Sequence, residues 1–418
     1  MIMNRRILLC VAAGGVGALS VGILSWNQKV TSPKKKVVVL GGGYAGRQFV
    51  KSIDKCKYDV VLIDKNLHKD KKSFFFDLIE FNALIFQPQP NYVDSISANS
   101  IVNQFMYLPS GIKTLKDECT SVDNVKKTIS LKGEGVIDYD YLVFATGSIP
   151  DTNHIQMNYN CKNSMWYFFK DRGDLEALMT VFKIIGLEDV VIMGGGTTGV
   201  ELASELSKRI LETGSKRAPR ITAREDQPLK TVTIIEPSSR LLPKLKESTS
   251  KLITEHLVDQ HVEILTNAVI KGVDEGHLNV SVDGKDVRLK AVVAVWTCGV
   301  KSDDLAVRFV GHNNVTGTLA LPSSKGSTAA DSQGPTEETV FAIGDCNNLL
   351  PKSAQNAKQQ GAYLAGHFNA GFKASTSPYS FNSQGTMIRL ADRIFMDSPP
   401  YTGYLPLWVH RLIIALDI

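Results

Sequence analysis

Short runs of β-branched and aliphatic residues recur along the chain, and most of them stop at a turn of small residues or at an acid. Runs of this kind are typical of strands in a parallel sheet that is covered on both faces. We predict strands at 36–40, 58–63, 140–144, 189–193, 231–235, 291–295 and 340–343. Two of these runs lead through glycine-rich turns into helical segments. The pattern therefore predicts an α/β protein with two Rossmann-like dinucleotide-binding folds.

The first glycine-rich turn, GGGYAG at 41–46, lies between the strand 36–40 and a helix that we expect to end near Ile53. The next strand ends on Asp64, 18 residues after the last glycine. This order is far more specific than the glycines alone. Gly41 permits a tight turn, Gly43 lets the backbone approach a pyrophosphate, and Gly46 lets helix pack on strand. Asp64 would accept hydrogen bonds from ribose hydroxyls.

The second turn, GGGTTG at 194–199, follows the strand 189–193 and precedes a helix predicted over 200–211. Gly194, Gly196 and Gly199 take the same three roles. Glu236 ends the next strand, 37 residues after Gly199, and the polar segment 212–230 accounts for the extra length as a surface loop. A carboxylate here accepts from a free 2′-hydroxyl and disfavours a 2′-phosphate, which favours NADH. Arg240 is the nearest basic residue.

Two dinucleotide folds in one chain imply two nucleotides. The simplest arrangement is a flavoprotein that takes hydride from a nicotinamide.

The strand 340–343 stops at Gly344-Asp345, where a carboxylate next to a helix N-terminus suits sugar hydroxyls and phosphate-binding backbone groups. Ser353 is the expected N-cap of a helix that runs to about 369. Gln355, Gln359 and the adjacent Gln360 lie on this helix, the first two on one face. Solvated glutamines are the simple alternative.

With 418 residues, the chain is long enough for two or three domains, and its 43% hydrophobic and 21% charged residues are ordinary for a globular protein. The net charge of +5 is concentrated at the N-terminus, where residues 1–53 hold eight Lys or Arg and no acid. A general nucleic-acid surface is therefore not expected. Six cysteines without a C-x-x-C pair argue against a disulfide scaffold or dithiol exchange, and the scattered histidines predict no metal.

Both ends of the chain carry apolar segments. Residues 7–26 have no charge and, at about 1.5 Å rise per residue, would cross a bilayer as a helix. We favour an uncleaved membrane anchor over a signal peptide or a mitochondrial presequence. Near the C-terminus, an apolar stripe over 405–416 predicts an amphipathic helix with Pro406 in its first turn. Such a helix suits either the core or a membrane interface.

The run AQNAKQQG at 354–361 resembles the Ala-Gln-x-Ala-x-Gln-Gln-Gly motif of the type II NADH dehydrogenases, single-chain NADH:quinone oxidoreductases. The turn WTCGV at 296–300 is similar to a second motif of that family, with departures at Thr297 and Cys298. The resemblance implies FAD in the first fold, closed by Asp345, and NADH in the second, nested fold. It also implies that the turn Ala145-Thr146-Gly147 lies against the flavin.

The resemblance further implies that Gln355, Gln359 and Gln360 lie near the flavin and a membrane quinone, with Glu201 approaching from the second fold. A carboxylate that interacts with the helix dipole is the simpler explanation of Glu201.

The domain boundaries that we expect are 1–35 for the anchor, 36–165 and 301–372 for FAD, 166–300 for NADH, and 373–418 for a membrane-associating region. The mitochondrial inner membrane is the expected location, with a bacterial-type plasma membrane as the alternative. A homodimer is one candidate state. Rival functions are apoptosis-inducing-factor-like or sulfide:quinone-type enzymes and a membrane-tethered redox switch of low turnover.

Overall fold

A computed structural model describes residues 33–67, 108–152, 156–157, 166–170, 174, 177–178, 180–182, 189–212, 232–274, 277–291, 293–310, 313–321, 338–373, 377–406 and 409. The apolar segment 7–26 and the expected surface loop beyond Glu212 lie outside these ranges. Within them, no helix is long and apolar enough to cross a membrane.

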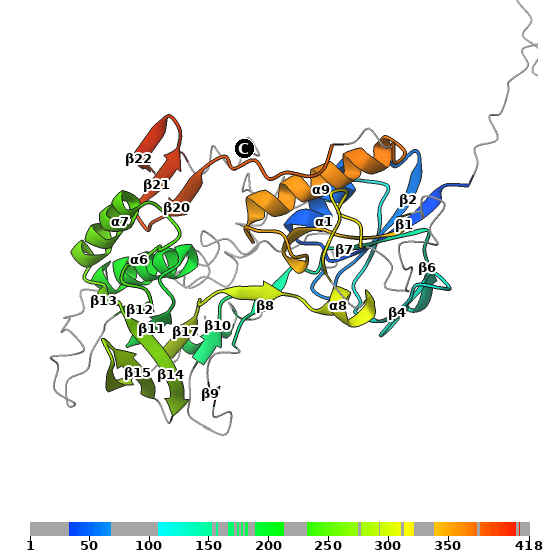
Figure 1. Cartoon of the computed structure of the whole chain (residues 1–418). Coiled ribbons are helices and arrows are strands. Elements are labelled where there is room, and N and C mark those ends of the chain that lie inside the picture. The colour runs from blue at the N-terminus through cyan, green and yellow to red at the C-terminus, as the bar shows by residue number, and fades with distance from the viewer. Residues whose placement is uncertain are drawn as a thin grey trace, which may run out of the picture. The chain divides into compact units, whose positions relative to one another are not determined.

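The first sheet is parallel and has the strand order β19-β7-β1-β2-β3. Its strands are β1 (Lys35–Leu40), β2 (Tyr58–Ile63), β3 (Lys113–Leu115), β7 (Tyr141–Phe144) and β19 (Val340–Ala342). Helix α1 (Tyr44–Ser52) follows β1, and the 3₁₀ turn η1 (Gly344–Cys346) and helix α9 (Ala354–Asn369) follow β19 (Figure 1). The chain thus returns to its first sheet late in the sequence, as nesting of the two folds predicts.

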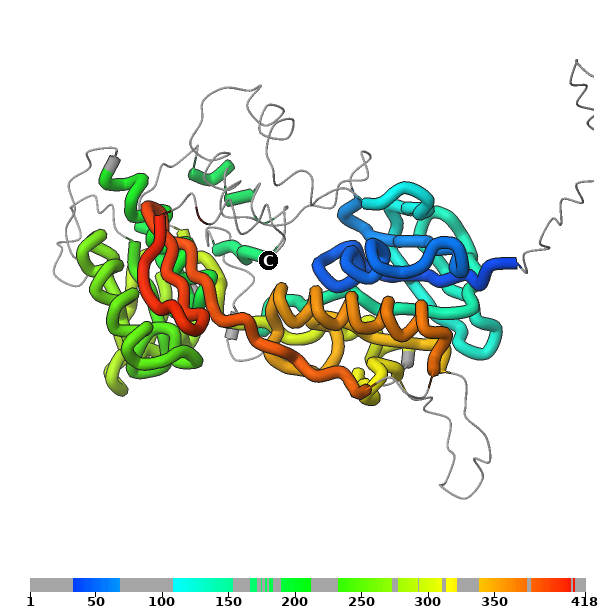
Figure 2. The backbone as a smooth tube through the Cα atoms, turned by 90° about the horizontal axis from the view of Figure 1, so that it is seen from above, coloured from blue at the N-terminus to red at the C-terminus, as the bar shows by residue number. Residues whose placement is uncertain are grey.

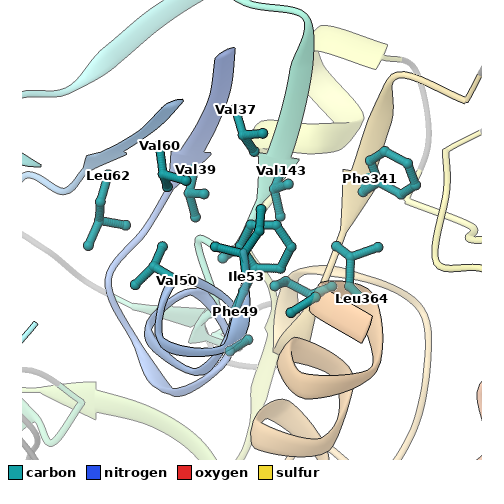
Figure 3. Packing of buried hydrophobic residues seen from close by; sticks show 14 of the residues in the cluster. Val37, Val39, Phe49, Val50, Ile53, Val60, Leu62, Val143, Phe341 and Leu364 are labelled. Carbon is teal, nitrogen blue, oxygen red and sulfur yellow. The ribbon is translucent and has the colours of Figure 1, made fainter. Parts of the chain in front are cut away.

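The core under α1 and α9 is built from alternate residues of the first sheet. Val37 and Val39 point toward α1 and α9, and Phe49 of α1 and Leu364 of α9 pack against the same face (Figure 3). The Phe49 and Phe368 rings meet edge to face, with centroids 5.3 Å apart. Aromatic pairs of this geometry add to the free energy gained by burying their area. This packing fixes both helices on one face of the first sheet.

The second sheet is also parallel, with the order β10-β17-β11-β12-β13. Its strands are β10 (Trp166–Phe168), β11 (Val190–Met193), β12 (Val232–Ile235), β13 (Glu263–Leu265) and β17 (Val293–Trp296). Helices α6 (Thr197–Glu212) and α7 (Glu247–Asp259) pack on it. Helix α6 begins three residues before the predicted start, inside the glycine-rich turn.

Smaller elements surround the two parallel sheets. One antiparallel sheet contains β4 (Cys119–Asp123), β5 (Thr128–Leu131) and β6 (Gly135–Asp138). Another contains β14 (Ala268–Asp274), β15 (His277–Val282) and β16 (Lys285–Lys290), joined by β9 (Gln156–Met157). Strands β8 (Ser148–Pro150) and β18 (Val300–Ser302) form a pair, and the short helix α8 (Leu305–Val310) follows β18.

The last described elements are three antiparallel strands, β20 (Thr386–Arg389), β21 (Arg393–Ser398) and β22 (Tyr401–Pro406). This sheet lies beside α6 and α7 (Figures 1 and 2) and adds Ile388, Leu390 and Phe395 to their core.

Leu405 and Pro406, expected at the start of a terminal helix, instead end β22, so that prediction is wrong for these two residues. Pairing with β21 decides the conformation, and proline is tolerated because β22 is an edge strand. Of the rest of the expected helix, only Val409 is described, and it is helical.

Candidate functional site

The turn between β1 and α1 has the geometry of a phosphate-binding loop. Gly41 has a φ of +106°, and a Cβ there would lie 2.3 Å from the Ala145 carbonyl oxygen. A Cβ on Gly46 would lie 2.0 Å from the Gly41 oxygen. At Gly43, in contrast, no described residue beyond its chain neighbours lies within 4 Å of an added Cβ. Two glycines are required by the fold itself, and the third leaves open space at the helix N-terminus, where a pyrophosphate fits.

Asp64 closes this turn from the end of β2. Its Oδ2 accepts a hydrogen bond from the Gly42 N–H at 2.6 Å, and its Oδ1 accepts one from the Asn66 N–H at 2.7 Å. The neighbouring Arg47 was not singled out from the sequence, yet it is buried on α1. Burial lowers the pKa of Arg47 to about 10, and the Asp64 carboxylate partly offsets that shift. Only the position directly after Gly46 could have drawn attention to Arg47.

The Gly344-Asp345 turn is held from α9 by Gln360. Gly344 has a φ of +77°, and its N–H donates to the Gln360 Oε1 at 2.7 Å. The Asn347 Nδ2 donates to the same oxygen, also at 2.7 Å. Gln360 is fully buried, so its amide is neither solvated nor available to a substrate. The side chain therefore fixes the shape of the turn.

Residues 145–147 lie in the same region, at the carboxyl end of β7. The Ala145 N–H donates to the Leu40 carbonyl at 2.8 Å, which ties this turn to the end of β1. Gly147 has a φ of +78°. Next to it, the Ser148 hydroxyl donates to the Asp345 Oδ2 at 3.0 Å. The structure thus brings both predicted flavin-contacting turns, 145–147 and 344–345, against each other.

Lys352 holds the loop that follows Asp345 through hydrogen bonds of its ammonium group. Its role was not predicted from the sequence. Its Nζ donates to the Ser302 Oγ at 2.8 Å, the Asp345 carbonyl at 2.8 Å and the Asn347 carbonyl at 2.9 Å. Burial lowers the pKa of Lys352, although Asp345 opposes that shift. All three ammonium protons are used, so this side chain is a positioning residue for the loop.

The second glycine turn repeats the geometry of the first. Gly194 has a φ of +111°, and a Cβ there would lie 2.9 Å from the Thr297 backbone. A Cβ on Gly199 would lie 2.0 Å from the Gly194 oxygen, whereas nothing lies within 4 Å of one on Gly196. Thr297, a departure from the resembled motif, lies close enough to bond the Met193 and Gly194 carbonyls, at 2.8 and 3.0 Å. The turn again leaves open space at a helix N-terminus.

Glu236 closes the second turn as Asp64 closes the first. Its Oε2 accepts from the Gly195 N–H at 2.8 Å, and its Oε1 accepts from the Ser238 N–H at 2.9 Å.

Arg240, the nearest basic residue in sequence, is already engaged. Its guanidinium donates to the Leu242, Pro243 and Leu245 carbonyls at 2.9 to 3.1 Å. The carboxylate at this site is therefore not countered by Arg240.

Gln355, Gln359 and Glu201 all bond the backbone of one segment, residues 382–389. The Gln359 Nε2 donates to the Asn382 carbonyl at 2.7 Å, and the Gln355 Oε1 accepts from the Gln384 N–H at 3.1 Å. From α6, the Glu201 Oε1 accepts from the Arg389 N–H at 2.9 Å. The three side chains predicted for the quinone reaction are thus linked through this segment.

Comparison with known proteins agrees with this geometry. The model of the pyridine nucleotide-disulphide oxidoreductase family matches residues 35–361. A probable mitochondrial NADH-ubiquinone oxidoreductase of Schizosaccharomyces pombe is 26% identical over 384 residues, or 81% of this chain and 63% of the relative. The chain therefore spans less than two thirds of that relative's length. A type II NADH:quinone oxidoreductase of Staphylococcus aureus is 26% identical over 390 residues, or 85% of this chain and 88% of the relative.

Among solved structures, NDH2 of Plasmodium falciparum, in complex with NADH, has the same fold, with a TM-score of 0.68. It is 19% identical, and the match covers 92% of this chain and 97% of that one. A persulfide reductase of A. fulgidus also has this fold, with a TM-score of 0.62 and 17% identity over 87% of this chain and 63% of the other. Because the family model matches residues 35–361, a span that contains both glycine turns, the chain belongs to the pyridine nucleotide-disulphide oxidoreductase family.

Proposed function

We propose that this chain is a flavoprotein that oxidises NADH and reduces a membrane quinone. The observation that carries the proposal is the pair of glycine turns, each closed by an acid and each open at its middle glycine. When bound, FAD would supply the hydride-accepting and electron-donating chemistry. The named activities of the Schizosaccharomyces pombe and Staphylococcus aureus relatives support the same reaction.

In this proposal the first fold holds FAD and the second holds NADH. The FAD-binding groups would be Gly41, Gly43, Gly46, Asp64, residues 145–147, Gly344 and Asp345. Those for NADH would be Gly194, Gly196, Gly199 and Glu236. The assignment rests on the nesting of the second sheet within the first and on the Asp345 turn, which closes only the first fold. The domain boundaries at 36–165, 166–300, 301–372 and 373–418 follow from it.

NADH rather than NADPH is the proposed donor. Glu236 would present its carboxylate to the 2′ position of the adenosine ribose, where a phosphate would be repelled. The Arg240 guanidinium already donates to three backbone carbonyls, so it is not available to bind a 2′-phosphate, and this supports the preference for NADH.

The quinone half of the reaction is assigned to the region of Gln355, Gln359 and Glu201. Their hydrogen bonds to residues 382, 384 and 389 support a role through the segment that they hold. In this view they position the wall of the acceptor site, and Gln360 positions the Asp345 turn next to it.

Three of the described cysteines, Cys119, Cys298 and Cys346, do not favour sulfide-type chemistry, which needs a thiolate. Burial raises the pKa of Cys298 to about 12, with Glu236 adding to the shift. Burial likewise raises the pKa values of Cys119 and Cys346 to about 11. These thiols stay protonated at neutral pH, so they are poor nucleophiles.

Attachment to a bilayer is proposed through residues 7–26 and the C-terminal region, with the mitochondrial inner membrane as the site and a bacterial-type plasma membrane as the alternative. Deleting residues 1–30 should give a folded, yellow protein that still associates with liposomes but is removed by salt or carbonate. Tight retention after that deletion would exclude residues 7–26 as the anchor.

The test of the function is spectroscopic. Purified protein should show the visible absorbance of a flavin, lose it when NADH is added without oxygen, and regain it when a soluble quinone follows. Steady turnover with quinone separates an enzyme from a redox switch. A protein that NADH does not bleach would refute the proposal.

A further inference from the structure

Arg389 is a buried cation for which the described part of the chain provides no side-chain partner. The residue is 9% exposed, its Nε is buried, and among the described residues its side chain makes no hydrogen bond or ion pair. Burying an uncompensated charge costs several kcal/mol in effective terms, roughly the scale for one ion in a protein interior. Buried polar groups are almost always paired, so an isolated guanidinium at this depth indicates a ligand.

The position of Arg389 is fixed by its backbone. Its N–H donates to the Glu201 Oε1 at 2.9 Å, and two residues later the Ala391 N–H donates to the Ser204 Oγ at 3.1 Å. Ile388 and Leu390 enter the core with α6 and α7, whereas Arg389 alternates to the other face of the strand. The guanidinium therefore does not pack into that core. Strand β20, which carries Arg389, lies at the flank of α6 (Figures 1 and 2).

That flank is next to the second glycine turn. Glu201 is two residues beyond Gly199, about 3 Å farther along the axis of α6 at about 1.5 Å per residue. The stretch from Gly194 to Glu201 contains no Lys or Arg. Apart from backbone N–H groups, it offers an anion only the partial charge of the helix N-terminus, about half an elementary charge.

The charges at the second turn require another cation. A dinucleotide pyrophosphate adds two negative charges to a site that already contains Glu201 and Glu236. Arg240 is bound to three carbonyls, and Lys208, farther along α6, donates to the Ala391 carbonyl at 3.3 Å. The first fold has a buried arginine of its own, Arg47, directly after its last glycine, where the second fold has Val200.

We propose that Arg389 binds the pyrophosphate of the nicotinamide dinucleotide, supplying from the C-terminal sheet the cation that the second glycine turn lacks. Glu201 acts here as a positioning residue, because its carboxylate holds the backbone from which Arg389 extends. The inference rests on the proposed function, since it names the group recognised at the NADH site. It makes the C-terminal sheet part of that site.

The test uses ADP-ribose, which retains the pyrophosphate and lacks the nicotinamide, titrated by calorimetry into the full-length FAD-containing protein. Arg389→Gln should weaken ADP-ribose binding by about 10- to 100-fold, the range for one hydrogen-bonded charge, and Arg389→Lys by less. Adenosine, without phosphate, should bind both proteins equally. The matched control is Arg393→Gln on β21, whose guanidinium bonds Asp392 and lies over the Tyr404 ring.

Thermal unfolding separates binding from a structural role. Without nucleotide, Arg389→Gln should unfold at the parent temperature or above, because it removes a buried charge and no hydrogen bond. With ADP-ribose, its gain in Tm should be smaller than that of the parent.

Parent-like ADP-ribose binding by Arg389→Gln would overturn this inference, even if quinone reduction slowed. A lower Tm without nucleotide would also overturn it. If the parent protein itself does not bind ADP-ribose, the proposed NADH site fails, and this inference fails with it.

Discussion

The side-chain amide of Gln359 forms a two-point hydrogen bond with the backbone of Asn382. Its Nε2 donates to the Asn382 carbonyl at 2.7 Å, and its Oε1 accepts from the Asn382 N–H at 3.0 Å. An amide that pairs with a peptide group in this way replaces a strand partner that the segment lacks. Residues 377–385 do not belong to a strand, so side chains fix this part of the segment.

Replacing Gln359 with leucine should therefore free Asn382. Loss of two neutral hydrogen bonds costs about 1–3 kcal/mol, so the Asn382 amide should exchange its hydrogen about 5- to 150-fold faster. In a stopped-flow experiment, NADH should still bleach the flavin at the parent rate, while reoxidation by quinone slows. Gln48→Leu is the control, since the Gln48 amide bonds Ser52 within α1. Slower bleaching with unchanged reoxidation would place Gln359 on the NADH side.

Valine at Gly43 and at Gly196 should separate the two nucleotides. Apart from the adjacent residues, no described part of the chain lies within 4 Å of a Cβ at either position, so both variants should keep the parent fold and block only the bound nucleotide. Gly43→Val should be colourless, and Gly196→Val should be yellow but not bleached by NADH. Absorbance spectra and thermal unfolding of the two proteins measure this. A yellow Gly43→Val and a colourless Gly196→Val would mean that FAD binds in the second fold and NADH in the first.

Glutamine at Glu236 should relax the preference for NADH over NADPH. Removing one charge beside the 2′ position should change the ratio of kcat/KM values by about 5- to 150-fold, corresponding to about 1–3 kcal/mol. Arg240→Gln is the control and should leave that ratio unchanged, because Arg240 is bound to backbone carbonyls. An unchanged ratio in Glu236→Gln would mean that another residue sets the preference.

The contact between α7 and the C-terminal sheet should weaken in acid. Burial lowers the pKa of His256 below its ordinary value of 6.5, even though Asp392, at 3.5 Å, favours the charged form. The unfolded chain therefore binds this proton more readily, and the stabilisation present above pH 6.5 is lost as the pH falls through the folded-state pKa. Thermal unfolding between pH 7.5 and 5 should show a smaller loss of Tm in His256→Gln than in the parent. If the Tm of the parent and of His256→Gln fell equally with pH, His256 would not be the source of the loss of stability in acid.

Seven strands of the two parallel sheets were predictable, because each is a buried apolar run that stops at a turn of small residues or at an acid. The short edge strands β3, β10 and β13 were not predicted. The prediction of 58–63 matches β2 residue for residue, and Ser353 is the N-cap of α9, accepting from the Asn356 N–H at 3.2 Å. Local sequence determines these features, since a buried strand and a helix cap need only their own residue types.

Contacts between distant residues were not predictable in the same way. The three-stranded sheet at 386–406 was missed because strand pairing decides its structure, although turn residues at Asp392 and Pro399 mark the connections between its strands. The glutamines were expected near a substrate, and the sequence contained nothing to show that Gln360 would bond Gly344 or that Gln359 would bond Asn382. The domain boundaries and the roles of the site residues stay predictions.

The threefold hydrogen bonding of Lys352 has a consequence for chemical labelling. An amine must lose a proton and expose its lone pair before it reacts with an acylating reagent, and here every N–H is bound to Ser302, Asp345 or Asn347. In the folded protein Lys352 should react far more slowly than the exposed Lys126 or Lys132. The rate at which reagent modifies Lys352 therefore measures how often the loop beside Asp345 opens, without any need to observe the flavin.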